Sequence, residues 1–470
     1  MPGPCAGRDL GAQQRSSERR KHGRGARLPA ESPSPGVAVG ALGFACLRLA
    51  AFLLRRLGQH VQQFQERSSP DPGPGLGAPV LPKAGWPQQP LDPFNATDGR
   101  SFLQRYWVNA QHWAGQDAPV FLHLGGEGGL GPGSVMRGHP AALAPAWGAL
   151  VISLEHRFYG LSVPAGGLGL AQLRFLSSRH ALADAASARL ELSRLLNVSA
   201  SSPWICFGGS YAGSLAAWAR LKFPHLVSAS VASSAPVRAV LDFSAYNEVV
   251  SRSLTSTAIG GSLQVGVEPS PAHSERGLGR GSRQGRSLRD GGMVMRSLCL
   301  RCFSVSRAET VAQLRATEPQ AAVVGDRQWL YQTCTEFGFY VTCEHPRCPL
   351  SQLPALPSQL ALCEQVFGLS ATSVAQAVAQ TNSYYGGQTP EATRVLFVNG
   401  DTDPWHVLSV TQTLGPSEPA LLIPSASHCS DMAPARPSDP PSLLLGRQNI
   451  SQQLRTWLWA AKDSQVRSGV

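Results

Sequence analysis

Residues 204–213 (WICFGGSYAG) join a short apolar run to two glycines and a serine, directly before a helical pattern. Glycine adopts backbone conformations that other residues avoid, so Gly208 and Gly209 allow a sharp turn between a strand and a helix. A serine at the apex of such a turn exposes its hydroxyl, and the next backbone N–H is aimed at the same space. We therefore predict that Ser210 is a nucleophile.

The stretch departs at one position from G-x-S-x-G, the pattern usual for a nucleophilic serine turn. Ala212 stands where the pattern has its last glycine, and Gly213 follows one residue later. Turns rich in Gly and Ser are common, so this match alone has little weight. A serine nucleophile also needs a histidine base and an acid that orients the base.

The late part of the chain has both partners, in the order Ser, acid, His. A predicted strand at 395–398 leads into a turn-rich loop that contains Asp403, and a predicted strand at 421–423 is followed by His428. In this assignment, His428 takes the proton of Ser210 and returns it to the leaving group, while Asp403 fixes the imidazole tautomer. These three residues form the predicted catalytic triad.

Each partner has an alternative role. Asp401 and Asp403 are both of the type that caps a turn through its own side chain. His428 has the alternative of an ordinary surface histidine, and His406, which follows Asp403 closely, is a rival base. The joint match of order and position favours the triad.

Acyl transfer also needs backbone donors for the oxyanion of its transition state. We predict the Tyr211 N–H, directly after Ser210, as one donor. The second donor is expected from the glycine-rich loop 125–129 after the first predicted strand, with Gly126 as the candidate. The alternative for this loop is a flexible turn.

The elements that must position these residues alternate between strands and helices. Predicted strands cover 119–124, 150–154, 204–207, 226–232, 394–398 and 420–423, and predicted helices cover 181–196, 211–222 and 448–459. This alternation predicts an α/β fold with an open sheet. Roughly 160 residues separate the fourth and fifth strands, far more than an ordinary connection, and they predict an inserted cap.

The net charge of +11 raises the question of nucleic-acid binding. Much of the excess lies in residues 1–30 and 268–296, which contain no aromatic residue that could stack on bases. Their Gly-, Ser- and Arg-rich composition is typical of disorder or of sequence foreign to the fold. We therefore expect no nucleic-acid partner. We also expect no cofactor and no metal.

Residues 36–54 are apolar apart from Arg48, and basic residues precede and follow them. We interpret residues 1–52 as an atypical secretory leader. An amphipathic helix is the alternative, and Arg48 argues against a firm membrane span.

Further features favour passage through the secretory pathway. Three N-x-[ST] sequons predict glycosylation at Asn95, Asn197 and Asn449. Four of the ten cysteines cluster in one polar segment: Cys334, Cys343, Cys348 and Cys363. We predict disulfides among them, with pairings that the spacing does not define. Zinc is the alternative, although no C-x-x-C pair supports it.

Four motifs together resemble a known family. They are residues 155–160 (EHRFYG), 208–213 (GGSYAG), 331–336 (YQTCTE) and 399–405 (NGDTDPW). In this order they resemble the serine exopeptidases that include prolyl carboxypeptidase and dipeptidyl peptidase II. The resemblance covers about residues 53–264 and 300–465.

The resemblance implies an α/β-hydrolase domain with a helical cap, and hydrolysis of peptides near proline or small residues through an acyl-enzyme. It implies location in endosomes or lysosomes, with processing of antigen peptides as a candidate role. It also carries the triad onto Ser210, Asp403 and His428. Trimming from the amino end and from the carboxyl end both stay open, and so does a homodimer.

The predicted parts of the chain are a leader (1–52), the first part of the hydrolase domain (53–240), the cap (241–390) and the second part of the hydrolase domain (391–470). Within the cap, residues 265–299 resemble no part of the family. The roughly 90 residues between Val240 and Trp329 are fewer than the family's cap has, so we expect a truncated cap. The alternative functions are an esterase on the same fold and a catalytically impaired isoform that binds peptides or partners.

Overall fold

A computed structural model describes residues 82–255, 307–319, 325–343 and 355–467. All of these residues belong to one compact unit of the chain. The predictions for the leader at 1–52, for the basic segment at 265–299 and for Cys348 lie outside the described residues.

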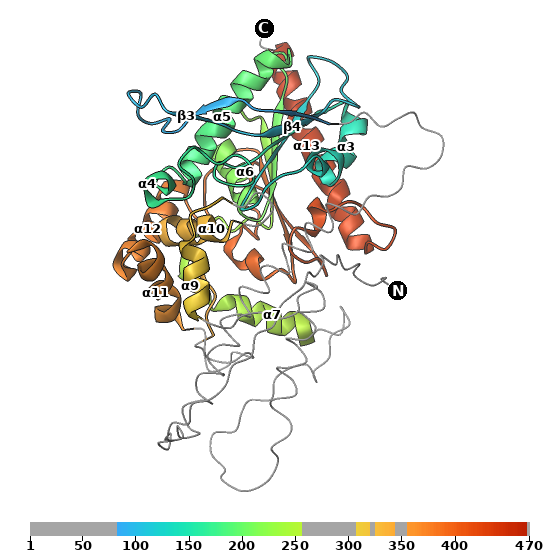
Figure 1. Ribbon diagram of the computed structural model, residues 1–470. Helices are drawn as coiled ribbons and strands as arrows, with labels where there is room; N and C mark the ends of the chain where they lie inside the picture. The colour runs from blue at the N-terminus through green and yellow to red at the C-terminus, as the bar shows by residue number, and fades with distance from the viewer. Residues whose placement is uncertain (1–81, 256–306, 320–324, 344–354, 468–470) are drawn as a thin grey trace, which may run out of the picture. The chain divides into compact units, whose positions relative to one another are not determined.

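An eight-stranded sheet forms the centre of the described part (Figure 1). In spatial order its strands are β1 (Lys83–Gly85), β4 (Tyr106–Asn109), β6 (Leu150–Leu154), β5 (Val120–Leu124), β7 (Trp204–Gly209), β8 (Ala229–Ser233), β11 (Val395–Gly400) and β12 (Ala420–Ile423). The pairs β1–β4 and β4–β6 are antiparallel, whereas the strands from β6 to β12 are parallel. The carboxyl ends of the parallel strands therefore meet along one edge of the sheet, where ligand sites of such sheets lie.

Helices cover both faces of this sheet. They are α2 (Gly133–Met136), α3 (His139–Trp147), α5 (Ser178–Leu195), α6 (Tyr211–Lys222) and α13 (Pro441–Arg467). Residues of α5 and α6 pack with Leu122 in one apolar cluster, and residues of α3 and α13 pack with Phe121 in another. Neighbouring residues of a strand point to opposite faces, so β5 is buried on both sides.

A third apolar cluster includes residues of a group of helices that lie together in Figure 1. They are α4 (Leu170–Leu173), α9 (Arg307–Arg315), α10 (Asp326–Gln332), the π-helical turn η3 (Thr333–Phe337), α11 (Leu356–Phe367) and α12 (Ala371–Tyr385). Two further strands, β9 (Val240–Asp242) and β10 (Gly338–Tyr340), pair in parallel beside η3, and α7 (Ala245–Thr255) follows β9. A small antiparallel ribbon joins β2 (Gln88–Pro90) and β3 (Ser101–Leu103).

The structure confirms the α/β fold class and several predicted bounds. The helix at 211–222 and the strands at 150–154 and 420–423 begin and end where expected. The strand expected at 226–232 begins only at Ala229, because the Leu226 and Val227 N–H groups donate to the Phe223 carbonyl in a turn after α6. The last helix begins earlier than expected, at Pro441, since proline is well suited to a first helical turn.

Disulfides are confirmed for three cysteines of the predicted cluster. Cys334 pairs with Cys363, which joins η3 to α11. Cys343 is disulfide-bonded as well. The zinc alternative is wrong for these three residues, because a bridged sulfur is not available as a thiolate ligand. Cys206 and Cys429 are free thiols.

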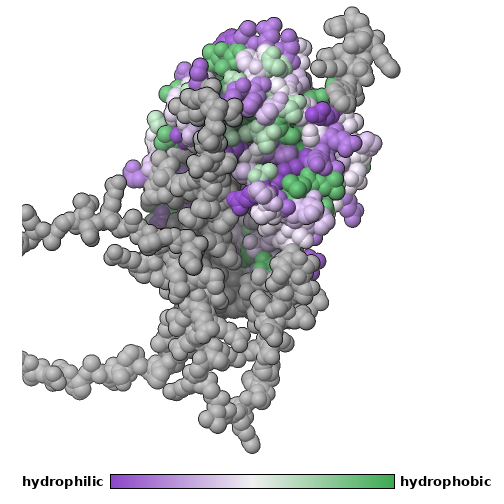
Figure 2. Space-filling model, turned by 90° about the vertical axis from the view of Figure 1, so that its right-hand side faces the viewer, coloured by the Kyte–Doolittle hydropathy of each residue, from purple (hydrophilic) through white to green (hydrophobic). Residues whose placement is uncertain are grey.

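The described surface is mixed in character. On the face shown in Figure 2, small hydrophobic areas lie among hydrophilic ones, as is usual for a surface exposed to water. Within the described ranges, no helix combines the length and the apolar composition that a membrane crossing requires. The apolar stretch at 36–54 falls outside those ranges.

Candidate active site

The turn between β7 and α6 holds Ser210 at φ 60° and ψ −131°. A positive φ is strained for serine, and strain of this kind is common at catalytic positions. Gly208 permits the turn, because an added Cβ would lie 2.0 Å from the Ala212 carbonyl oxygen. The Gly213 and Ser214 N–H groups then donate to the Ser210 carbonyl and start the helix. Ser210 thus stands, partly exposed, at the end of a central strand.

Ala212, the departure from G-x-S-x-G, faces the glycine-rich loop. An added Cβ on Gly126 would be 3.4 Å from both the nitrogen and the Cβ of Ala212, which is ordinary van der Waals contact. Gly213 has no room for a side chain, since an added Cβ would lie 2.6 Å from the Ser233 carbonyl oxygen of β8.

The predicted acid and base form a hydrogen-bonded pair. His428 Nδ1 lies 2.9 Å and 3.0 Å from the two carboxylate oxygens of Asp403. A carboxylate only accepts hydrogen bonds, so Nδ1 carries the hydrogen and Nε2 is left to take up a proton. The Asp403 side chain is fully buried, whereas that of His428 is 32% exposed. The pair therefore combines a fixed acid with an accessible imidazole.

The structure shows which roles the two aspartates and the rival base, His406, have in this loop. Asp403 also accepts the Trp405 N–H at 2.9 Å as the N-cap of the short helix η4 (Pro404–Leu408), so it caps a turn and orients His428 at once. Asp401 accepts the Ser425 N–H instead. His406 directs Nδ1 at the Asp403 backbone carbonyl and not at its carboxylate.

The Asp403 carboxylate stabilises the charged form of His428. Burial would lower the pKa of this imidazole, but the charge and hydrogen bond of Asp403, with a contribution from the neighbouring Cys429, outweigh burial and raise the pKa well above its usual value. An imidazolium is therefore well stabilised beside Asp403.

The end of β8 ties the nucleophile turn to the histidine loop. The Ser210 N–H donates to the Ser233 carbonyl at 2.9 Å, and the Cys429 N–H donates to Ser234 Oγ at 2.9 Å. An added Cβ on Gly209 would lie 2.9 Å from Cys429 Sγ. The residues that flank Ser210 and His428 are thus in contact. The sequence analysis missed the role of the two serines, although their place directly after a parallel strand was a usable signal.

The glycine-rich loop after β5 is hydrogen-bonded at both of its ends. The Gly125 N–H donates to the Leu154 carbonyl at 2.8 Å. The Leu130 N–H donates to Glu155 Oε1 at 2.9 Å, and Arg105 pairs with the same oxygen at 2.6 Å. Glu155 is the first residue of the EHRFYG motif, which is thereby tied to the far end of the loop.

The predicted glycosylation sites lie on the surface. Asn95, Asn197 and Asn449 are all exposed. They follow β2, end a turn after α5 and lie within α13, respectively.

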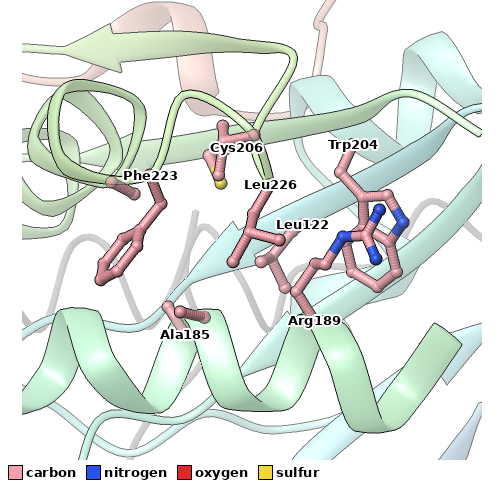
Figure 3. A pocket seen from close by; sticks show the side chains of 10 residues that line it. Leu122, Ala185, Arg189, Trp204, Cys206, Phe223 and Leu226 are labelled. Atoms are coloured by element: carbon pink, nitrogen blue, oxygen red, sulfur yellow. The ribbon is translucent and has the colours of Figure 1, made fainter. Parts of the chain in front are cut away.

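One apolar cavity lies away from these residues (Figure 3). Ala185 and Arg189 of α5 face Leu122, Trp204 and Cys206 of the sheet across it. Trp204 begins β7, at the opposite end of the strand from the Ser210 turn and about 20 Å from it at 3.3 Å per residue. This cavity is therefore no part of the candidate active site.

A strained serine turn follows a central parallel strand, and an Asp–His pair follows two later strands. This arrangement is that of an α/β-hydrolase of the serine type. The family model described as serine carboxypeptidase S28 matches residues 89–267 and 287–450. The chain belongs to this family, and it is accordingly a serine-type peptidase. Between its two parts the family model leaves only residues 268–286 unmatched. Residues 287–299, which the sequence analysis had set outside the resemblance, do match the family.

Similarity to individual proteins agrees with this family assignment. The chain is 66% identical to the human (Homo sapiens) thymus-specific serine protease over 491 aligned positions, which cover 89% of this chain and 96% of the relative. It is 36% identical to the mouse (Mus musculus) lysosomal Pro-X carboxypeptidase over 172 positions, 36% of this chain and 34% of the relative. Among solved structures, a Mycobacterium smegmatis proline iminopeptidase aligns with 80% of this chain and 100% of its own, at 13% identity and a TM-score of 0.36.

Proposed function

We propose that this peptidase is a serine exopeptidase in which Ser210, Asp403 and His428 form the catalytic triad. The observation that carries the proposal is the Asp403–His428 hydrogen bond, held at the same sheet edge as the strained serine turn. Asp403 keeps the hydrogen on Nδ1, so Nε2 is the nitrogen that receives the Ser210 proton.

The reaction then proceeds in two halves. Ser210 Oγ attacks the carbonyl carbon of the peptide and passes its proton to His428, while the Tyr211 and Gly126 N–H groups donate to the oxyanion. The C–N bond breaks as His428 returns the proton to the leaving amine, which leaves an acyl-enzyme. Water, deprotonated by His428, attacks this ester and releases the acid. The braced loop beside Ala212 supports Gly126 as the second donor.

We propose peptide substrates that are cut near proline or a small residue, in an endosomal or lysosomal compartment. Similarity to a protein named lysosomal Pro-X carboxypeptidase supports both points. Exposed sequons and disulfides support passage through the secretory pathway. Processing of antigen peptides is the proposed role within that pathway.

We also propose that residues 241–390 form a cap on the hydrolase domain, whose two parts are 53–240 and 391–470. The helices α9 to α12 support this division, since they pack around an apolar cluster separate from the two on the faces of the central sheet. They share this cluster with residues of the first part, among them Tyr159, Leu173 and Phe175. A cap of this kind encloses the peptide end, which is how an exopeptidase measures its distance from the terminus.

Hydrolysis of a panel of short peptides, with proline or alanine next to the cleaved bond, tests the proposal. We expect Ser210→Ala to lower kcat by about a millionfold, as loss of a serine nucleophile does in other serine peptidases. Ser201→Ala, which changes an exposed serine before β7, serves as the matched control and should leave kcat unchanged.

Folded wild-type protein that turns over none of the peptides would contradict the proposal in favour of an impaired isoform. Turnover of simple acyl esters without any peptide cleavage would identify an esterase on the same fold.

A further inference from the structure

The phenol of Tyr211, the residue after the nucleophile, is buried between side chains from two distant segments. Only 1% of this residue is exposed. Its hydroxyl lies 3.0 Å from His156 Nε2 and 2.9 Å from Gln332 Nε2. Both partners belong to motifs singled out in the sequence, EHRFYG and YQTCTE, to which the proposed reaction gives no direct role.

The hydrogen bonds of this group have one consistent direction. His156 Nδ1 lies 2.7 Å from the Arg157 carbonyl, which only accepts, so Nδ1 carries the hydrogen and Nε2 accepts from the Tyr211 hydroxyl. Gln332 Nε2 donates to the same hydroxyl, and Gln332 Oε1 accepts the Tyr159 hydroxyl at 2.6 Å. Burial lowers the pKa of His156 to about 4, so the ring keeps this tautomer from neutral to mildly acid pH.

Packing fixes the ring as well as the hydroxyl. The Tyr211 ring centroid lies 5.3 Å from that of Trp329 and 5.3 Å from that of Phe337. Tyr211 is also the first residue of α6, so its backbone N–H is one of those that a helix start leaves without an acceptor in the helix. The Tyr211 side chain is held at its hydroxyl by hydrogen bonds and along its ring by packing. These contacts restrict the orientation of the Tyr211 backbone N–H.

The segment that supplies Gln332 is itself firmly attached. Glu336, one turn later, accepts the Ser178 N–H at 3.0 Å and the Ser178 hydroxyl at the start of α5. The Cys334–Cys363 disulfide fixes the same segment to α11. Gln332 is therefore a rigid support for the Tyr211 hydroxyl.

We propose that Tyr211 is a positioning residue, whose hydroxyl, held by His156 and Gln332, aligns its own backbone N–H with the oxyanion. This inference rests on the proposed function, and it gives the helices at 326–337 a part in catalysis. An oxyanion donor contributes fully only at the correct distance and angle, so a released phenol should weaken transition-state binding and spare substrate binding.

The test is Tyr211→Phe, which removes the hydroxyl and keeps the ring. We expect kcat to fall by about tenfold to a hundredfold with KM unchanged, a part of the loss that follows removal of a whole oxyanion donor. The affinity for a peptide boronate or aldehyde, which mimics the tetrahedral intermediate, should fall by the same factor. Tyr340→Phe is the matched control, since its buried hydroxyl contacts Cys363 Sγ and lies outside this group.

In a second variant, Gln332→Met, the new side chain has nearly the same shape as glutamine but no N–H that could donate to the Tyr211 hydroxyl. This variant tests the proposal even if Tyr211→Phe does not fold. It should reproduce the loss in kcat and in affinity for the intermediate mimic. The proposal would be overturned if Tyr211→Phe and Gln332→Met had the same kcat as Tyr340→Phe and bound the boronate or aldehyde with the same affinity. An active Ser210→Ala variant would instead overturn the proposed function, so the two failures are distinguishable.

Discussion

Two groups of polar side chains flank the Ser210 turn, and they differ in exposure and in charge. At the sheet edge, His428 is 32% exposed and pairs with the Asp403 carboxylate. On the side of α10 and η3, the hydroxyl of Tyr211 is buried with neutral partners, His156 and Gln332. The proton transfer proposed for His428 needs access to the substrate and a nearby charge that stabilises the imidazolium. A group that fixes an orientation is best buried, neutral and fully hydrogen-bonded. We expect substitutions to affect the two groups in different ways.

The largest effect is expected at the exposed, charged group. Asp403→Asn keeps the shape of the side chain but offers an amide in place of a carboxylate, which favours the wrong tautomer of His428. We predict a loss in kcat of about ten-thousandfold, measured on the peptides that the wild type cleaves. The raised pKa of His428 should fall in this variant, because the carboxylate that raises it is gone.

Asp401→Asn is the matched control for this change. Asp401 is exposed in the same loop and accepts only the Ser425 N–H in the contacts described here. Its substitution should alter kcat by less than about threefold, as is usual for an exposed side chain away from the reaction. Equal losses in both variants would mean that the loop as a whole, and not the Asp403–His428 pair, supports the activity.

A smaller effect, on stability, is expected at Glu336, which lies one turn after Gln332 of the buried group. Burial raises the pKa of Glu336 to about 7, against the hydrogen bonds from Ser178 that lower it. The folded protein therefore binds a proton more tightly than the unfolded chain does between about pH 4.5 and 7. The contribution to stability is complete below pH 4.5 and is lost as the pH rises to 7. Relative to Glu336→Gln, the Tm of the wild type should fall by several degrees over this range.

Thermal unfolding of both proteins at pH 4.5, 6 and 7.5 measures this difference in Tm. Both proteins contain the same buried histidines, so the effect of those histidines on Tm cancels in the difference. Glu364→Gln, on the exposed side of α11, is the control and should shift Tm equally at every pH. A wild-type Tm that rises relative to Glu336→Gln as the pH increases would show that Glu336 is held in its charged form. That result would contradict the prediction that Glu336, beside the neutral group, is itself protonated below pH 7.

The same contrast separates what the sequence predicts from what it does not. Ser210, Asp403 and His428 follow strands, and the ends of parallel strands share one edge, so their place at that edge follows from order and pattern alone. The partners of the Tyr211 hydroxyl lie 55 and 121 residues away, and their side chains meet only through packing. The periodicity of apolar residues does not show which side chains will pack together. The motifs that contain His156 and Gln332 could be found in the sequence, but their contact with the Tyr211 hydroxyl could not.

Local geometry also explains where the predicted elements were incomplete. The antiparallel strands β1 and β4 are only three and four residues long, too short for a period-two pattern to stand out. The alanine at 212 looked like a defect in the serine turn. The structure shows that Ala212 packs beside Gly126 of the neighbouring loop and that the position without room for a side chain is Gly213, which no local pattern reports.

The most direct test of the central claim is covalent labelling of the folded protein with a fluorophosphonate, followed by mass spectrometry of its peptides. We predict a single adduct on Ser210, absent from Ser210→Ala and formed far more slowly in Asp403→Asn. An adduct on another serine, or no adduct on folded wild-type protein, would contradict the assignment of Ser210 as the nucleophile.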